Sequence, residues 1–254
     1  MPTKSTAPYS GPPSWLDPLK ELPLSKAPHY VWADVVRECM ANLIASEVPV
    51  RMAAGVIANM ANESARGRSI WYGNAGGWKI TRAYAEEYKR KNGTNPYWWK
   101  ARGNVSSDDP DWCFYRAFDS VAQFLDEWMT HFVPAPSLNP KPYPGYARAG
   151  KEFAEGNSRW FLSLIRVGYK GRPSKLRLAA LELVGQGDSH PSYREHLSLT
   201  QDVLEVWAQL KLGVDPDGAW GPKSRGACML FQQEHGLQPS GNLDNATLEA
   251  LKLA

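Results

Sequence analysis

The chain of 254 residues is long enough for one large domain, or for one medium and one small domain. Its hydrophobic and charged fractions, 43% and 22%, are ordinary for a globular protein and argue against a disordered chain. The formal net charge of only +3 disfavours a dedicated nucleic-acid-binding protein, because such proteins concentrate basic residues on one patch.

The N-terminal segment 1–27 is rich in Pro and small polar residues, so we predict an extended arm on the surface of the next domain. It holds no apolar run of signal-peptide length, and no stretch of the chain is apolar enough to span a membrane. We therefore expect synthesis in the cytoplasm and no stable membrane association.

Helical periodicity begins near Tyr30 and continues to about Ala45, and a second helix is predicted from about Val50 to Glu63. The glycine-rich segment 64–80 predicts loops. A helix from Thr81 to Lys91 follows, and the segment 92–118 predicts loops with a short strand or hairpin.

The next predicted helix starts at Val121, is capped by Asp119 or Ser120, and ends before Pro134. Further helices are predicted at 146–155, 158–167, 173–185 and 199–211. The polar, turn-rich segment 186–198 is the best domain boundary in the sequence.

The last sixty residues contain an internal repeat with an offset of 23. Gly218 matches Gly241, Trp220 matches Leu243, and Ser224 matches Thr247. In each copy a Gly permits a tight turn, an apolar residue fills the core, and a helix starts downstream. These two units and the helix 199–211 predict a small three-helix bundle.

The run Asp-Gly-Ala-Trp-Gly-Pro-Lys-Ser at 217–224, with Phe231-Gln232, Gly236-Leu237 and the second copy, resembles the helical peptidoglycan-binding domain of wall hydrolases. We assign it to residues 196–254. The resemblance implies a shallow ligand groove near the first turn and the following helix. The positions it implies are Asp217, Gly218, Trp220, Gly221, Ser224 and Gln232.

Glu63 is the candidate proton donor of the first domain. Hydrolysis of a glycosidic bond needs such a donor at the leaving oxygen, and its surroundings must keep the acid protonated. Val56, Met60 and Glu63 share one helix face, so we expect this carboxyl to lie partly shielded at a cleft, which the glycines that follow help to open.

The stretch 56–69, with Glu63-Ser-Ala-Arg-Gly67 at its centre, resembles the catalytic helix of the lysozyme-like superfamily, in particular the glucosaminidases of glycoside hydrolase family 73. The runs 77–80, 115–120 and 168–169 resemble later motifs of that family, in order and spacing. The resemblance implies a mainly α fold: a lysozyme-like α+β catalytic domain over 28–190 with a small β or loop lobe.

The sequence departs from that family at two points. The motif tyrosine is Phe118, so Tyr115 and Tyr169 are the nearest phenols that could replace it. The candidates for the second catalytic carboxylate are Asp108, Asp109 and Asp111, of which we favour Asp109. A water or the N-acetyl group of the substrate is the alternative to a second carboxylate.

Eleven Trp and eleven Tyr are many for this length. Rings can pack in the core or stack on sugar faces. The candidates for sugar stacking are Trp78, Trp98, Trp99 and Trp112.

Three well-separated cysteines and few histidines predict neither a disulfide framework nor a metal site, and we expect no cofactor.

These observations predict a monomeric peptidoglycan glycosidase of the endolysin type, a phage protein that acts on the wall after release from the host cytoplasm. The favoured activity is endo-β-N-acetylglucosaminidase. The alternatives are an N-acetylmuramidase or a lytic transglycosylase. A protein of another class, a non-catalytic wall-binding protein, is also consistent with the departures from the motif. A peptide-bond amidase would need a Cys/His pair or a metal.

Overall fold

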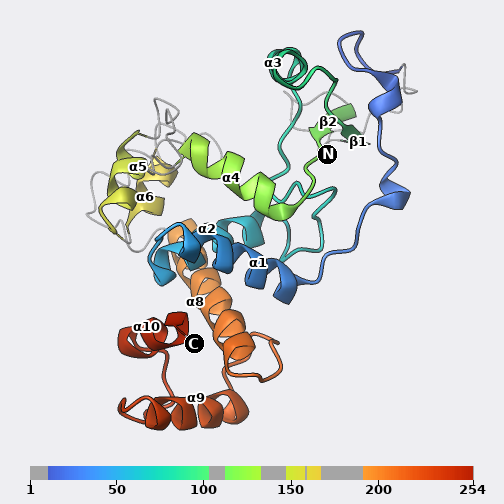
Figure 1. Cartoon of the computed structure of the whole chain (residues 1–254). Helices are drawn as coiled ribbons and strands as arrows, with labels where there is room; N and C mark the ends of the chain where they lie inside the picture. Colours follow the sequence, from blue (N-terminus) through green and yellow to red (C-terminus); the bar gives the residue numbers. More distant parts are fainter. Residues whose placement is uncertain (1–10, 103–111, 133–146, 158, 167–190, 254) are drawn as a thin grey trace.

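The structure is a computed structural model, and it describes residues 11–102, 112–132, 147–157, 159–166 and 191–253 (Figure 1). It is mainly helical, as predicted. The helices are α1 (Trp32–Ala45), α2 (Val50–Glu63), α3 (Arg82–Asn92), α4 (Val121–Phe132), α5 (Ala147–Ala154), α6 (Trp160–Arg166), α8 (Pro191–Lys211), α9 (Pro222–Glu234) and α10 (Asn245–Leu253). The predicted helix at 173–185 lies outside the described residues.

Helix α2 is the centre of the fold, and its residues are buried almost all round, from Val50 to Ala61. Small residues let neighbouring helices approach it closely. At Gly55, a Cβ would lie 3.5 Å from Nε2 of His196 in α8. A helix that is apolar on every side is typical of a protein core, and this one ends at the candidate acid Glu63.

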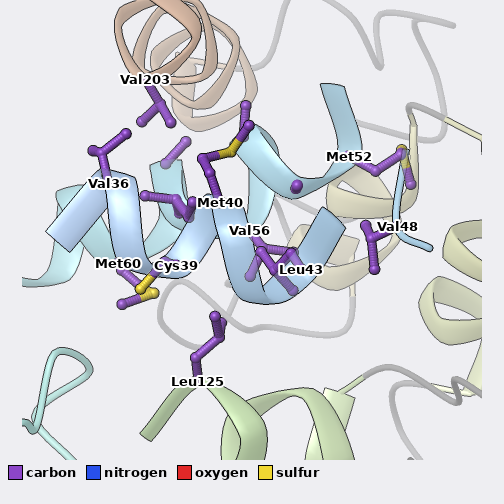
Figure 2. Packing of buried hydrophobic residues seen from close by; sticks show 14 of the residues in the cluster. Val36, Cys39, Met40, Leu43, Val48, Met52, Val56, Met60, Leu125 and Val203 are labelled. Atoms are coloured by element: carbon purple, nitrogen blue, oxygen red, sulfur yellow. The ribbon is translucent and has the colours of Figure 1, made fainter. Parts of the chain in front are cut away.

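Helices α1 and α8 pack on α2, and α4 packs on α1, in one hydrophobic core. Figure 2 shows Val203 of α8 and Leu125 of α4 approaching from opposite sides, with Met40 and Cys39 of α1 between them. The core therefore runs without interruption from the first part of the chain into α8. Helix α8 begins at Pro191, eight residues before the predicted start at 199.

The predicted hairpin consists of β1 (Trp98–Arg102) and β2 (Trp112–Arg116), which pair antiparallel with Trp98 opposite Arg116. Helix α4 follows it, and the Ser120 hydroxyl accepts a hydrogen bond of 3.0 Å from the Gln123 N–H. Ser120 is thus the capping residue, one of the two that were predicted.

The N-terminal arm, described from residue 11, lies on the hairpin and α3 with two 3-10 turns, Pro18–Lys20 and Leu24–Lys26 (Figure 1). Leu16 is buried against Ile80 and Ala85. The Leu22 N–H donates to the Trp98 carbonyl at 2.7 Å. The arm is therefore part of the packed lobe.

Candidate active site and wall-binding module

Glu63 is the last residue of α2, and its side chain is exposed. Val56 and Met60 share its helix face and are buried, but the turn that follows leaves the end of that face open to solvent. We expected a partly shielded carboxyl, and this expectation is wrong, because the described residues leave the Glu63 side chain exposed. Solvent access is compatible with contact to a large polymer.

The turn after Glu63 has an unusual backbone, because Ala65, Arg66 and Gly67 all have positive φ, at 50°, 56° and 84°. Such values cost about 1 kcal/mol or more for a residue with a side chain, so neighbouring contacts must hold them. The Ser64 hydroxyl donates to the Met60 carbonyl at 2.7 Å and accepts from the Gly67 N–H at 3.1 Å. Ser64 and Gly67 of the predicted motif thus fix the chain beside the acid.

Two of the predicted sugar-stacking residues are structural. Trp98 is fully buried and donates its indole N–H to the Asp17 carbonyl at 2.9 Å. Trp99 is 3% exposed, and its ring stacks on Tyr115 with centroids 4.3 Å apart. Their faces are covered, so neither can stack on a sugar, and one face of Tyr115 is likewise occupied.

Trp78 remains accessible in part. Its ring meets Phe124 edge-on at 5.4 Å, and the Arg116 guanidinium lies 5.0 Å from its centroid. The buried Asn74 fixes its backbone, because the Asn74 Oδ1 accepts from the Trp78 N–H and the Asn74 Nδ2 donates to the Trp78 carbonyl. Asp109, Tyr169 and the side chain of Trp112 lie outside the described residues.

A cavity of about 310 Å³ that sequence analysis did not identify lies in the same lobe. Five tyrosines line it: Tyr30, Tyr72, Tyr84, Tyr88 and Tyr97. Phe118 is also in its wall, whereas Glu63 is not. Burial raises the pKa of Tyr84 to about 12, so this phenol stays neutral at physiological pH. The signal in the sequence was the tyrosine spacing in α3, where Tyr84 and Tyr88 share a face.

The cysteines offer no reactive group in the described residues, because Cys39, Cys113 and Cys228 are free and buried. Burial raises the pKa of the Cys228 thiol to about 11, which suppresses the thiolate near neutral pH. No cluster of His, Cys, Asp and Glu in the described part of the chain could hold a metal ion. No described helix is long and apolar enough to cross a bilayer.

The two repeats near the C-terminus are each organised by a buried glutamine, Gln209 in the first and Gln232 in the second. The Gln209 Oε1 accepts from the Gly218 N–H at 2.9 Å, and its Nε2 donates to the Ser224 hydroxyl at 3.0 Å. The Gln232 amide makes the same bonds, at 2.8 Å, to Gly241 and Thr247. Gln209 and Gln232 also differ by 23 positions, a match that sequence analysis missed.

This network explains several predicted wall-binding residues. Ser224 and Gln232 are buried and hydrogen-bonded within the repeats, so they position the turns and do not face a ligand. Gly218 has a φ of 75° and lies against Val206, where only glycine fits well. Trp220 is half-buried and donates to the Gly241 carbonyl at 3.0 Å. Asp217 and Gly221 remain accessible for wall contact.

Residues 200–251 match the family described as a putative peptidoglycan binding domain. The match spans most of α8, both glutamine networks and most of α10. The chain therefore carries a peptidoglycan-binding domain over these residues, and this domain supports peptidoglycan as the partner. No curated protein and no solved structure matches the chain.

The peptidoglycan-binding domain contacts both ends of α2. Near the start of α2, Arg51 donates to the Asn245 side chain at 2.8 Å and to the Leu243 carbonyl at 3.1 Å. Beyond its end, the Arg66 guanidinium pairs with the Asp202 carboxylate of α8. Between these contacts, α8 packs along α2. The helix that presents Glu63 is thus held by the domain that binds the wall.

Proposed function

We propose that the protein is a peptidoglycan glycosidase of the endolysin type, with Glu63 as its general acid. One observation carries the proposal: the peptidoglycan-binding domain packs along α2, whose final residue is the carboxylic acid at the predicted catalytic position. In this proposal, the wall that the domain binds also reaches the surface on which Glu63 is exposed.

In the proposed reaction, Glu63 donates a proton to the leaving glycosidic oxygen as the sugar gains oxocarbenium character. Because Glu63 is exposed in the free protein, the bound glycan strand itself has to exclude water from the carboxyl. Asp109 is the proposed second carboxylate, and water or the N-acetyl group of the substrate is the alternative. The favoured bond is the one after N-acetylglucosamine, as in the glucosaminidases that the motifs resemble.

The second candidate function is non-catalytic wall binding. It is favoured by Phe118, which lacks the hydroxyl of the motif tyrosine, and by the exposure of Glu63. This protein would grip the wall through the same domain without cutting it.

Substitution Glu63→Gln separates the two. We expect glycan cleavage to fall by about 10²- to 10⁴-fold, because proton donation is lost, while binding to purified walls is unchanged. Glu38→Gln, at an exposed position of α1, is the matched control and retains activity. Mass spectrometry of the digest identifies the bond. A new N-acetylglucosamine reducing end supports the favoured activity, N-acetylmuramic acid indicates a muramidase, and an anhydro end indicates a transglycosylase. If wild type and Glu63→Gln both bind walls without cleaving them, the non-catalytic function stands.

A further inference from the structure

A cavity of about 480 Å³ lies where α1, α8 and α10 meet, and we call it the seam cavity. Its walls are mainly apolar, formed by Ala41, Ile44, Ala45, Trp207 and Leu210. Both parts of the chain contribute, because α1 precedes the peptidoglycan-binding domain and the other two helices belong to it. The volume is in the range of small-ligand sites.

Three cationic side chains complete the lining, one from each helix: Arg37, Lys211 and Lys252. Arg37 pairs with Asp34 at 2.5 Å, and Lys252 lies 4.0 Å from Glu249. Neither acid lines the cavity. The first pair is solvent-exposed and the second partly so, and each is worth at most about 1 kcal/mol, so a ligand carboxylate can replace either acid at little cost.

We propose that the seam cavity binds the stem peptide of peptidoglycan, with its free carboxylates on the three cations and its alanine methyl groups against the apolar wall. The inference rests on the wall as the target of the proposed function, and it adds a second point of contact to the predicted turn groove. The stem peptide fits because it joins several carboxylates to small apolar side chains within a few residues.

Other wall and cell components match the cavity less well. Glycan hydroxyls are neutral and call for open aromatic faces, but Trp207 is only 3% exposed. A membrane surface calls for a broad basic and apolar face, whereas this lining is confined to eight residues around one hollow. A short anionic peptide satisfies both the charge and the size.

The test is titration of the protein with free stem peptide, followed by calorimetry or by amide chemical shifts. We expect saturable binding that weakens with salt and is lost when the peptide carboxylates are amidated. Lys211→Glu removes one attraction and adds one repulsion, so it should weaken binding by about tenfold. Ala41→Trp fills the hollow without changing charge and should abolish binding.

Lys223→Glu is the matched control, because Lys223 is exposed on α9, outside the seam cavity and close to the turn groove. It should leave peptide affinity unchanged. The proposal is overturned if the peptide does not bind, if the amidated peptide binds equally well, or if Lys223→Glu weakens binding as much as Lys211→Glu. Peptide affinity is measured separately from glycan cleavage, and Glu63→Gln should leave peptide binding intact. Failure of the catalytic proposal and failure of the peptide-binding proposal are therefore distinguishable.

Discussion

Replacement of Gln232 by alanine should destabilise the protein by about 3 kcal/mol. The side chain is 0% exposed, and its amide spans the turn of the second repeat. Alanine leaves the Gly241 N–H without the acceptor at 2.8 Å and the Asn242 carbonyl without the donor at 3.0 Å. Each orphaned backbone group costs about 1 kcal/mol or more, and the cavity left behind adds a similar amount. The Thr247 hydroxyl keeps its bond to Asp244, so it contributes little to the loss.

The assay is urea unfolding followed by circular dichroism, with Gln233→Ala as the control. Gln233 is the exposed neighbour on α9, and its substitution should change the free energy of unfolding by less than about 0.5 kcal/mol. Folded Gln232→Ala should still bind walls, because the side chain does not reach the surface. Equal stability of the two variants would refute the structural role of Gln232, and loss of wall binding by a folded variant would restore it as a contact residue.

Two further predictions follow from the fold and its hydrogen bonds. Leu204→Ala, in the buried face of α8, should lower the free energy of unfolding by about 2–5 kcal/mol. Circular dichroism and tryptophan fluorescence should show the same lowered midpoint, because the whole chain unfolds in a single transition. Leu230→Ala, 62% exposed on α9, should leave that midpoint unchanged. The pKa of Asp244 is lowered below 3.8 by hydrogen bonds from the Thr247 backbone and side chain, so its stabilisation is present above about pH 4 and is lost as the pH falls through the lowered value. The thermal midpoints of wild type and Asp244→Asn should therefore differ at pH 6 and converge as the pH falls through the lowered pKa of Asp244, and a constant difference would contradict this linkage.

The helices were predictable from the sequence where local signals were strong. The predicted bounds of α2 match the structure at both ends, because Pro49 precedes it and a positive-φ turn follows Glu63. The early start of α8 was missed because its first turns are polar. His196 is buried there only through contacts with other elements, including a ring stacked 3.6 Å from Phe161.

The aromatic candidates show why a site needs tertiary information. Trp98 and Trp99 are adjacent in a strand, so their side chains point to opposite faces of the hairpin. Both are buried, because the arm covers Trp98 through Leu16 and Asp17, while Tyr115 covers Trp99. An arm some eighty residues away in the chain cannot be placed from local patterns.

The packing of α8 along α2 determines which bonds of its substrate an enzyme of the proposed kind could reach. A catalytic domain on a flexible tether samples every bond within the reach of its linker. Here the peptidoglycan-binding domain and the Glu63 carboxyl are joined through packed helices. The distance along the glycan strand between the bound wall unit and the cleaved bond would therefore be constant. Fragments released from a regular wall should then fall into narrow length classes instead of a broad spread.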